Sequence, residues 1–153
     1  MLIPLLVGIG TLLVSVAIQS AATSYMLDCL IYFKRRGILG VGFFRDAVTL
    51  GLMLTIVVVG NLTQMAIWAL VFVMCGQFDH YETALYFSAV NFTTLGYGDI
   101  VLTSRWRILG PLEAANGVLM FGLSAAIAYA AMIHIFELRL GKDEKYHGLK
   151  TQE

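Results

Sequence analysis

Three long stretches of this sequence carry almost no charge, and they restrict what the chain can fold into. Residues 2–27 and 47–78 contain no Asp, Glu, Lys or Arg, and residues 114–136 can acquire a positive charge only at His134. A helix that crosses the ~30 Å hydrocarbon core of a bilayer needs about 20 mostly apolar residues. The stretches therefore predict three transmembrane helices. No basic residue precedes the first stretch, and its apolar run exceeds that of a secretory signal, so we expect a retained helix within residues 1–33.

The composition agrees with a membrane protein. Of the 153 residues, 59% are hydrophobic and 13% are charged, whereas soluble domains average about 45–50% apolar and about 25% charged residues. Ten Lys and Arg balance ten Asp and Glu, so no positive excess predicts a nucleic-acid partner. The sequence contains no phosphate-binding loop, zinc-ligand cluster or nucleophile–base pattern. We therefore expect no enzymatic activity and no cofactor.

The distribution of basic residues predicts how the chain is oriented in the plasma membrane. Eight of the ten lie in two segments, one before the second stretch and one after the third. They are Lys34, Arg35, Arg36, Arg45, Arg139, Lys142, Lys145 and Lys150. The positive-inside rule places such segments in the cytoplasm. We therefore expect the N-terminus and residues 79–107 outside, and an interfacial cytoplasmic linker at 34–46 that contacts lipid. We also expect a short cytoplasmic tail at 138–153 that is frayed from Gly141 onward.

The segment between the second and third stretches combines a short helical pattern with glycines. Residues 82–93 can form about three helical turns, which reach about half-way across a bilayer. Gly96 and Gly98 follow, and glycine is unfavourable in a helix interior. Irregular backbone at membrane depth is tolerated where it lines a water-filled cavity. The sequence thus predicts an all-α membrane protein with a re-entrant pore helix at 82–93 between an outer helix at 47–78 and an inner helix at 108–137.

The residues that follow this short helix resemble the selectivity filter of potassium channels, in the run Thr94-Leu95-Gly96-Tyr97-Gly98-Asp99. The run Leu112-Glu113-Ala114, with Gly117, is similar to the start of the inner helix in small prokaryotic channels with one pore loop. The resemblance covers residues 47–137, and residues 1–33 add a helix to the minimal two-helix pore. It implies passive conduction of potassium, with the bacterial inner membrane as the location.

The chemistry of the six residues supports this interpretation. A potassium ion that leaves water needs oxygens arranged like its hydration shell. Backbone carbonyls and the Thr94 hydroxyl can supply them, and the residues expected to bind K⁺ are Thr94, Leu95, Gly96 and Tyr97. Aiming successive carbonyls in one direction requires left-handed backbone at alternate residues, which Gly96 and Gly98 adopt at little cost.

The number of pore loops predicts the assembly. One chain supplies one loop, whereas four carbonyls in each ring require four loops, so we expect a homotetramer around a four-fold axis. Two alternatives remain open. The first is a cation channel with weak selectivity, which a change at Tyr97 or Asp99 would have favoured. The second is an accessory subunit that joins other pore chains.

Four further residues are expected to support the filter, namely Thr93, Tyr86, Phe87 and Glu113. Many potassium channels carry two adjacent tryptophans in the pore helix, and the second donates a hydrogen bond to the filter aspartate. The aligned residues here are Tyr86 and Phe87, and Phe87 has no donor. Asp99 must then bond water, Tyr86 or a neighbouring chain, or remain loosely held. We expect an outer filter that inactivates readily at low external potassium.

Residues in or next to the three stretches have further candidate roles. Glu113 could brace the filter from behind or reach interfacial water, and we favour bracing because an unpaired carboxylate in hydrocarbon is costly. Gly117 and Gly122 could be gating hinges or sites of close helix packing. Polar residues recur every fourth position in the first stretch, and two more lie in the second. We expect hydrogen bonds between these sets, which are Thr11, Ser15, Gln19 and Thr23, and Asn61 and Gln64.

Overall fold

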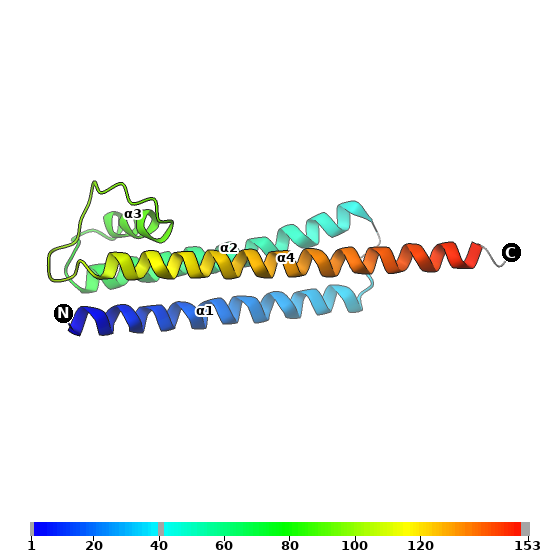
Figure 1. Ribbon diagram of the computed structural model, residues 1–153, viewed down its shortest axis with the longest axis horizontal. Helices are drawn as coiled ribbons and strands as arrows, with labels where there is room; N and C mark the ends of the chain where they lie inside the picture. The colour runs from blue at the N-terminus through cyan, green and yellow to red at the C-terminus, as the bar shows by residue number, and fades with distance from the viewer. Residues whose placement is uncertain (1, 40–41, 151–153) are drawn as a thin grey trace. The chain divides into compact units, whose positions relative to one another are not determined.

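The computed structural model describes the backbone of residues 2–39 and 42–150 and forms four helices (Figure 1). They are α1 (Leu2–Arg35), α2 (Phe43–Met74), α3 (Tyr81–Phe92) and α4 (Leu109–Lys150). The described residues contain no β-strand. α1, α2 and residues 109–140 of α4 are each long and apolar enough to cross a membrane, whereas α3 has 12 residues and is too short to do so. The predicted all-α class with three transmembrane helices and one short intervening helix is confirmed.

Two glycines set the ends of α1 and α2. Gly37 and Gly76 have positive φ values of +67° and +66°. At Gly76 the amide donates to the Val73 carbonyl, and the next amide donates to the Phe72 carbonyl. This is the Schellman arrangement, in which a left-handed glycine follows the last turn of a helix. α2 therefore ends at Met74 rather than at the predicted residue 78, because backbone geometry and not apolar length ends the helix.

The start of α2 and the end of α4 also differ from the predicted boundaries. α2 begins at Phe43, four residues before the predicted residue 47, with Asp46 in its first turn, where the helix dipole favours an acidic side chain. The backbone of α4 stays helical to Lys150, so the tail at 138–153, which was expected to fray from Gly141, continues the helix as far as that residue. Eight of residues 138–150 are Leu, Glu, Lys or Arg, and all four types favour helices.

Parts of the predicted linker and tail lie outside the described residues. These parts are Gly40 and Val41 of the linker and residues 151–153 of the tail. The side chains of residues 141–150 are likewise outside the description. The predicted headgroup contacts of the linker and the cytoplasmic charges at Lys142, Lys145 and Lys150 therefore remain predictions.

The chain divides into two compact units. The first, here called the filter unit, comprises Met1–Ala21 and Val59–Leu123, and the second comprises Ala22–Val58 and Ser124–Glu153. The second unit has an aliphatic core that includes Met26, Met53 and Ala131. It also brings Nζ of Lys34 within 3.3 Å of Nε2 of His134. Since an ammonium group can only donate, Nε2 of this imidazole accepts.

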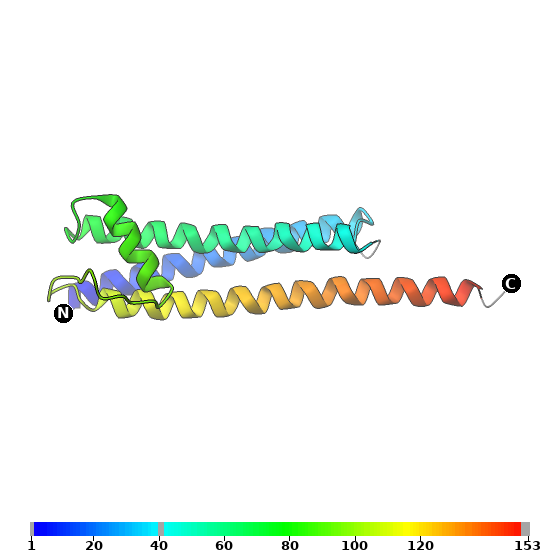
Figure 2. The ribbon, with the colours of Figure 1, turned by 90° about the horizontal axis from the view of Figure 1, so that it is seen from above.

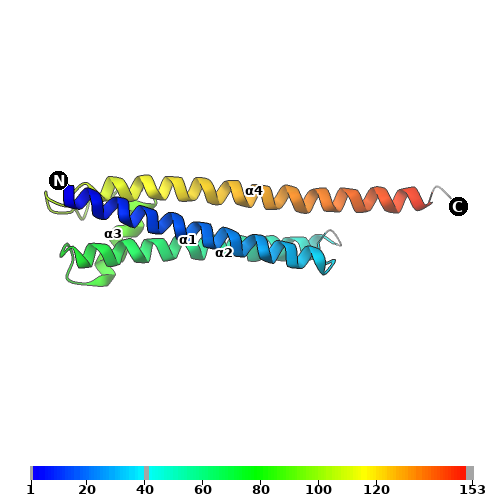
Figure 3. The same cartoon turned by 90° about the horizontal axis from the view of Figure 1, so that it is seen from below.

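In the filter unit, α3 crosses obliquely from the end of α2 to the beginning of α4 (Figure 2). The core beneath it is aromatic, and the rings of Phe72 and Phe87 meet edge to face with 5.1 Å between centroids. The beginning of α1 lies beside the beginning of α4 (Figure 3). A Cβ atom at Gly8 would lie 2.5 Å from Cδ1 of Leu112, so the absence of a side chain lets these helices approach closely.

The predicted hydrogen bonding between the first two transmembrane helices is confirmed at one pair. The amide Nε2 of Gln64 donates to Oε1 of Gln19 over 2.9 Å, and both side chains are fully buried in the filter unit. Thr11 does not take part, because its hydroxyl donates to the Val7 carbonyl of its own helix. The polar stripe of α1 thus contains one residue that joins two helices and another that bonds locally.

Candidate selectivity filter

We call the predicted filter, Thr94–Asp99, the filter segment. Hydrogen bonds attach its first residues to the end of α3. The amides of Leu95 and Gly96 both donate to the carbonyl of Val90, over 3.0 and 3.2 Å. The amide of Thr94 donates to the Asn91 carbonyl over 2.8 Å. The Thr93 hydroxyl donates to Ala89, also within α3. The first three residues of the filter segment are therefore tied to the C-terminal turn of α3.

The backbone carbonyl oxygens of residues 94–97 are available to bind a ligand. Among the residues that the structure describes, no hydrogen bond ends on a carbonyl oxygen of residues 94–97. Residues 94–97 are exposed in the single chain, so these oxygens are open to another ligand, such as water or a cation. This is the chemistry that a dehydrated cation needs, because carbonyl oxygens replace its hydration shell.

The backbone of the filter segment alternates in handedness. Gly96 and Gly98 have φ values of +57° and +74°, as predicted. Thr94 also has a positive φ of +60°, which sequence reasoning missed because a β-branched residue strongly avoids this region. Strained residues of this kind persist where the surrounding structure over-determines them, and they cluster at functional sites. The only sequence signal for Thr94 is its place two residues before Gly96 in an alternating series.

Asp99 at the end of the filter segment has a hydrogen-bond donor. The hydroxyl of Tyr86 donates to Oδ2 of Asp99 over 2.8 Å. This hydrogen bond is the main cause of a raised pKa for the Tyr86 phenol, with smaller effects of burial and of Asp99's charge, so the donor stays protonated at neutral pH. Of the partners considered from the sequence, Tyr86 is the one observed. Asp99 is therefore not loosely held, which was another of the possibilities left open. The predicted inactivation at low external potassium stays a prediction, but a missing tether at Asp99 no longer supports it.

Phe87 has a different role from the one the alignment with tryptophan suggested. Its side chain is buried and packs against Phe72 and Phe78, with centroids 5.1 and 5.2 Å away. A helix turns by about 100° per residue, so Tyr86 and Phe87 cannot face the same neighbour. Tyr86 faces the filter segment, and Phe87 anchors α3 in the aromatic core.

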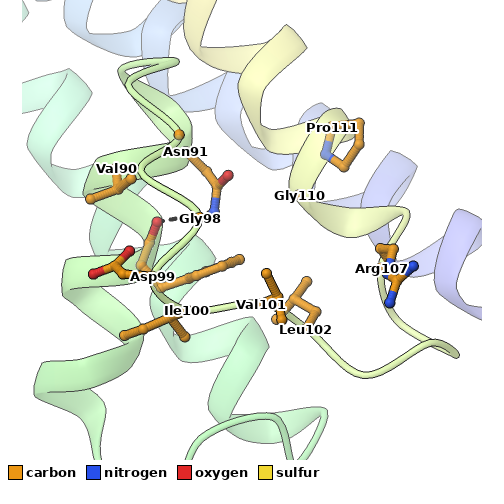
Figure 4. Close-up of a pocket in the computed structure, with 12 residues that line it drawn as sticks. Val90, Asn91, Gly98, Asp99, Ile100, Val101, Leu102, Arg107, Gly110 and Pro111 are labelled. Carbon is orange, nitrogen blue, oxygen red and sulfur yellow. Dashed lines mark hydrogen bonds between the residues drawn. The ribbon is translucent and has the colours of Figure 1, made fainter.

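A cavity of about 240 Å³ separates the filter segment from the beginning of α4 (Figure 4). Gly98 and Asp99 line it from the filter segment, and Gly110 and Pro111 line it from α4. Arg107 contributes from the loop before α4. The filter segment is therefore held by α3 on one side, whereas its side toward α4 leaves open space.

Glu113 contacts the pore helix, as the bracing interpretation expects. Its side chain is fully buried, and its Oε1 lies 2.5 Å from the hydroxyl oxygen of Ser88 on α3. The same hydroxyl oxygen lies 2.8 Å from the carbonyl oxygen of Met65 on α2. Sequence reasoning missed Ser88, whose only signal was a small polar residue on the otherwise apolar face of a short helix.

Gly117 is a site of close packing between α4 and α3. A Cβ atom there would lie 1.8 Å from the carbonyl oxygen of Phe92, the last residue of α3. Gly122 differs, because a Cβ atom there would meet nothing within 4 Å. Of the two roles considered for Gly117, packing is the one observed. Bending of α4 at Gly117 or Gly122 stays a prediction.

These features define a multi-pass membrane protein. Its short helix α3, which cannot span a bilayer, leads into a segment whose carbonyl oxygens at residues 94–97 accept no hydrogen bond from the described residues. Residues 61–134 match the model of an ion channel family. This match confirms the resemblance to the potassium-channel type of pore over slightly less than half of the chain, and the protein is an ion channel. No curated protein and no solved structure matches the chain.

Proposed function

We propose that this protein is a potassium-selective channel in which four copies surround one pore. The observation that carries the proposal is the filter segment, with left-handed backbone at Thr94, Gly96 and Gly98 and no hydrogen bond to the carbonyls of residues 94–97 within the described chain. Four such segments around an axis would supply stacked rings of oxygens for a dehydrated cation. Potassium is then the permeant ion, and conduction requires no cofactor.

The exposure of apolar side chains supports the assembly. Leu95 is 55% exposed and Tyr97 is 66% exposed in the single chain, and Val118 on α4 is 61% exposed. Apolar patches of this kind mark interfaces with lipid or with other chains. Since Leu95 and Tyr97 lie in the filter segment, neighbouring copies rather than lipid would cover them around a central pore.

A reversal-potential measurement tests the selectivity. The full chain is reconstituted into lipid vesicles or planar bilayers with potassium on one side and sodium on the other. We expect currents that reverse near the potassium equilibrium potential. Reversal midway between the two equilibrium potentials would indicate a weakly selective cation channel. Absence of current from correctly inserted protein would indicate an accessory subunit, and native mass spectrometry in detergent would show whether four copies assemble.

The proposed orientation in the plasma membrane has its own test. We place the N-terminus and the loop before α4 outside and the basic linker inside, on the basis of the positive-inside rule. In a variant with Cys29 and Cys75 replaced by serine, an impermeant thiol reagent should label Ser104→Cys in intact cells. It should label Arg36→Cys only after permeabilisation. The reverse pattern would contradict the orientation.

A further inference from the structure

Glu113 occupies a site that disfavours a negative charge. Its side chain is 0% exposed, its Oε2 has no hydrogen-bond partner, and Ser88 is its only polar partner among the described residues. Within that part of the chain no Lys, Arg or His pairs with it. An isolated ionised carboxylate in an apolar interior is strongly unfavourable, and such a group neutralises instead.

The helix termini nearby do not compensate for a charge. Glu113 is the fifth residue of α4, beyond the first turn in which a helix N-terminus favours a carboxylate. One turn further along α4, Gly117 packs against the carbonyl of Phe92 at the end of α3. That end of a helix carries a partial negative charge, which also opposes ionisation of Glu113.

The hydrogen atoms available at Ser88 lead to the same result. The Ser88 hydroxyl oxygen makes two oxygen–oxygen contacts at hydrogen-bond distance, one with the Met65 carbonyl and one with Oε1 of Glu113. Each contact requires one hydrogen, and a hydroxyl supplies only one. A backbone carbonyl supplies none. With a protonated Glu113, the carboxyl group supplies the second hydrogen and each of the two contacts has its own donor.

We propose that Glu113 is a neutral carboxylic acid that donates to Ser88, which in turn donates to the Met65 carbonyl. This two-bond relay joins α4, α3 and α2 in the filter unit. Ser88 lies two residues before Val90, whose carbonyl holds the amides of Leu95 and Gly96. Glu113 is thus a positioning residue that acts on the filter segment through α3. The inference rests on the pore architecture and does not require potassium selectivity.

Infrared spectroscopy of the full chain in lipid vesicles at neutral pH tests the protonation directly. A protonated carboxylic acid has a carbonyl stretching band that an ionised carboxylate lacks. We expect the wild-type minus Glu113→Gln difference spectrum to show this band. The matched control is Glu137→Gln, which changes an exposed glutamate on the same helix and should leave the band in place. Identical spectra of wild type and Glu113→Gln in this region would show that Glu113 is ionised, and the proposal would be wrong.

A second variant tests the partner. Ser88→Ala removes the oxygen that accepts from the acid, so the band should shift in frequency while keeping its intensity. A band unchanged by Ser88→Ala would contradict the relay. A merely space-filling Glu113 would not produce such a shift.

The functional test uses the neutral replacement. Glu113→Gln keeps a donor at the same place, so the potassium-to-sodium permeability ratio should stay within about twofold of the wild type. Glu113→Leu keeps no donor and should lower this ratio about tenfold or more. A tenfold change is equivalent to about 1.4 kcal/mol. Equal effects of both variants would contradict the relay. If the wild type shows the acid band but no potassium selectivity, the proposed function fails and this inference stands.

Discussion

The hydroxyl of Tyr86 on α3 and the carboxylate of Asp99 at the end of the filter segment are joined by a 2.8 Å hydrogen bond. The bond crosses 13 residues of sequence and restrains the outer end of a segment whose first residues are tied to Val90. Both ends of the filter segment are therefore attached to the same short helix. Loss of either attachment should affect the filter while leaving the transmembrane helices in place.

The first prediction concerns this tether. Tyr86→Phe removes the donor and little volume, so Asp99 should lose its restraint and the current should decay faster at low external potassium. Raising external potassium should slow the decay, because bound ions would hold the segment in place of the missing bond. Tyr81→Phe is the matched control, since that hydroxyl bonds the Ala66 carbonyl on α2 and not a residue of the filter segment. Equal decay in wild type and Tyr86→Phe at both potassium concentrations would contradict the role of the tether.

The second prediction concerns the residue next to it. Phe87→Trp would place a larger ring in the aromatic core rather than beside Asp99, since Phe87 is buried between Phe72 and Phe78. Overpacking a core typically costs about 1–3 kcal/mol. We expect a lower thermal unfolding midpoint in detergent and no slowing of current decay. Slower decay with unchanged stability would indicate that the new indole reaches Asp99.

The third prediction tests the packing role of Gly117 on α4. Gly117→Ala places a methyl group against the Phe92 carbonyl, so α3 and α4 must move apart and stability should fall by about 1–3 kcal/mol. Gly122→Ala is the control, because its methyl group meets nothing within 4 Å. Removing a helical glycine there should stabilise by about 0.4–1 kcal/mol. Thermal unfolding of both variants decides the matter, and unchanged stability of Gly117→Ala would refute the packing role.

The fourth prediction concerns the backbone of the filter segment. Gly96→Ala adds a Cβ atom where φ is +57°, at a cost of about 1–2 kcal/mol per residue. We expect loss of current or of selectivity in protein that still reaches the membrane. Gly10→Ala, on α1 with open space around it, is the control and should conduct normally. Wild-type currents from Gly96→Ala would mean that this residue does not shape the ion path.

The fifth prediction concerns the link between α1 and α2. Gln19→Leu and Gln64→Leu each remove one partner of the buried amide pair. Interhelical hydrogen bonds in membrane proteins average about 0.6 kcal/mol in double-mutant cycles, so the two changes should couple by about that amount in unfolding experiments. Additive effects of the two substitutions would show that the pair contributes no net stability.

The sequence determined the features that depend on chain length and local conformation. Apolar stretches long enough to cross a bilayer specified the three transmembrane helices, and a stretch too short to cross specified α3. The positive φ values of Gly96 and Gly98 followed from the carbonyl geometry that the motif requires. These properties reside within a few turns of backbone, so neighbouring residues in the sequence suffice to predict them.

The tertiary structure decided which side chains meet. Tyr86 rather than Phe87 faces the filter segment, Ser88 lies between Met65 and Glu113, and Gly117 packs on Phe92. Each outcome depends on the rotation of one helix about its axis and on its register against another. A change of one residue rotates a side chain by about 100°, and the apolar pattern of a membrane helix, which is hydrophobic on several sides, does not fix that angle. Packing between helices distant in the sequence fixes it, and with it the residues that hold the filter segment.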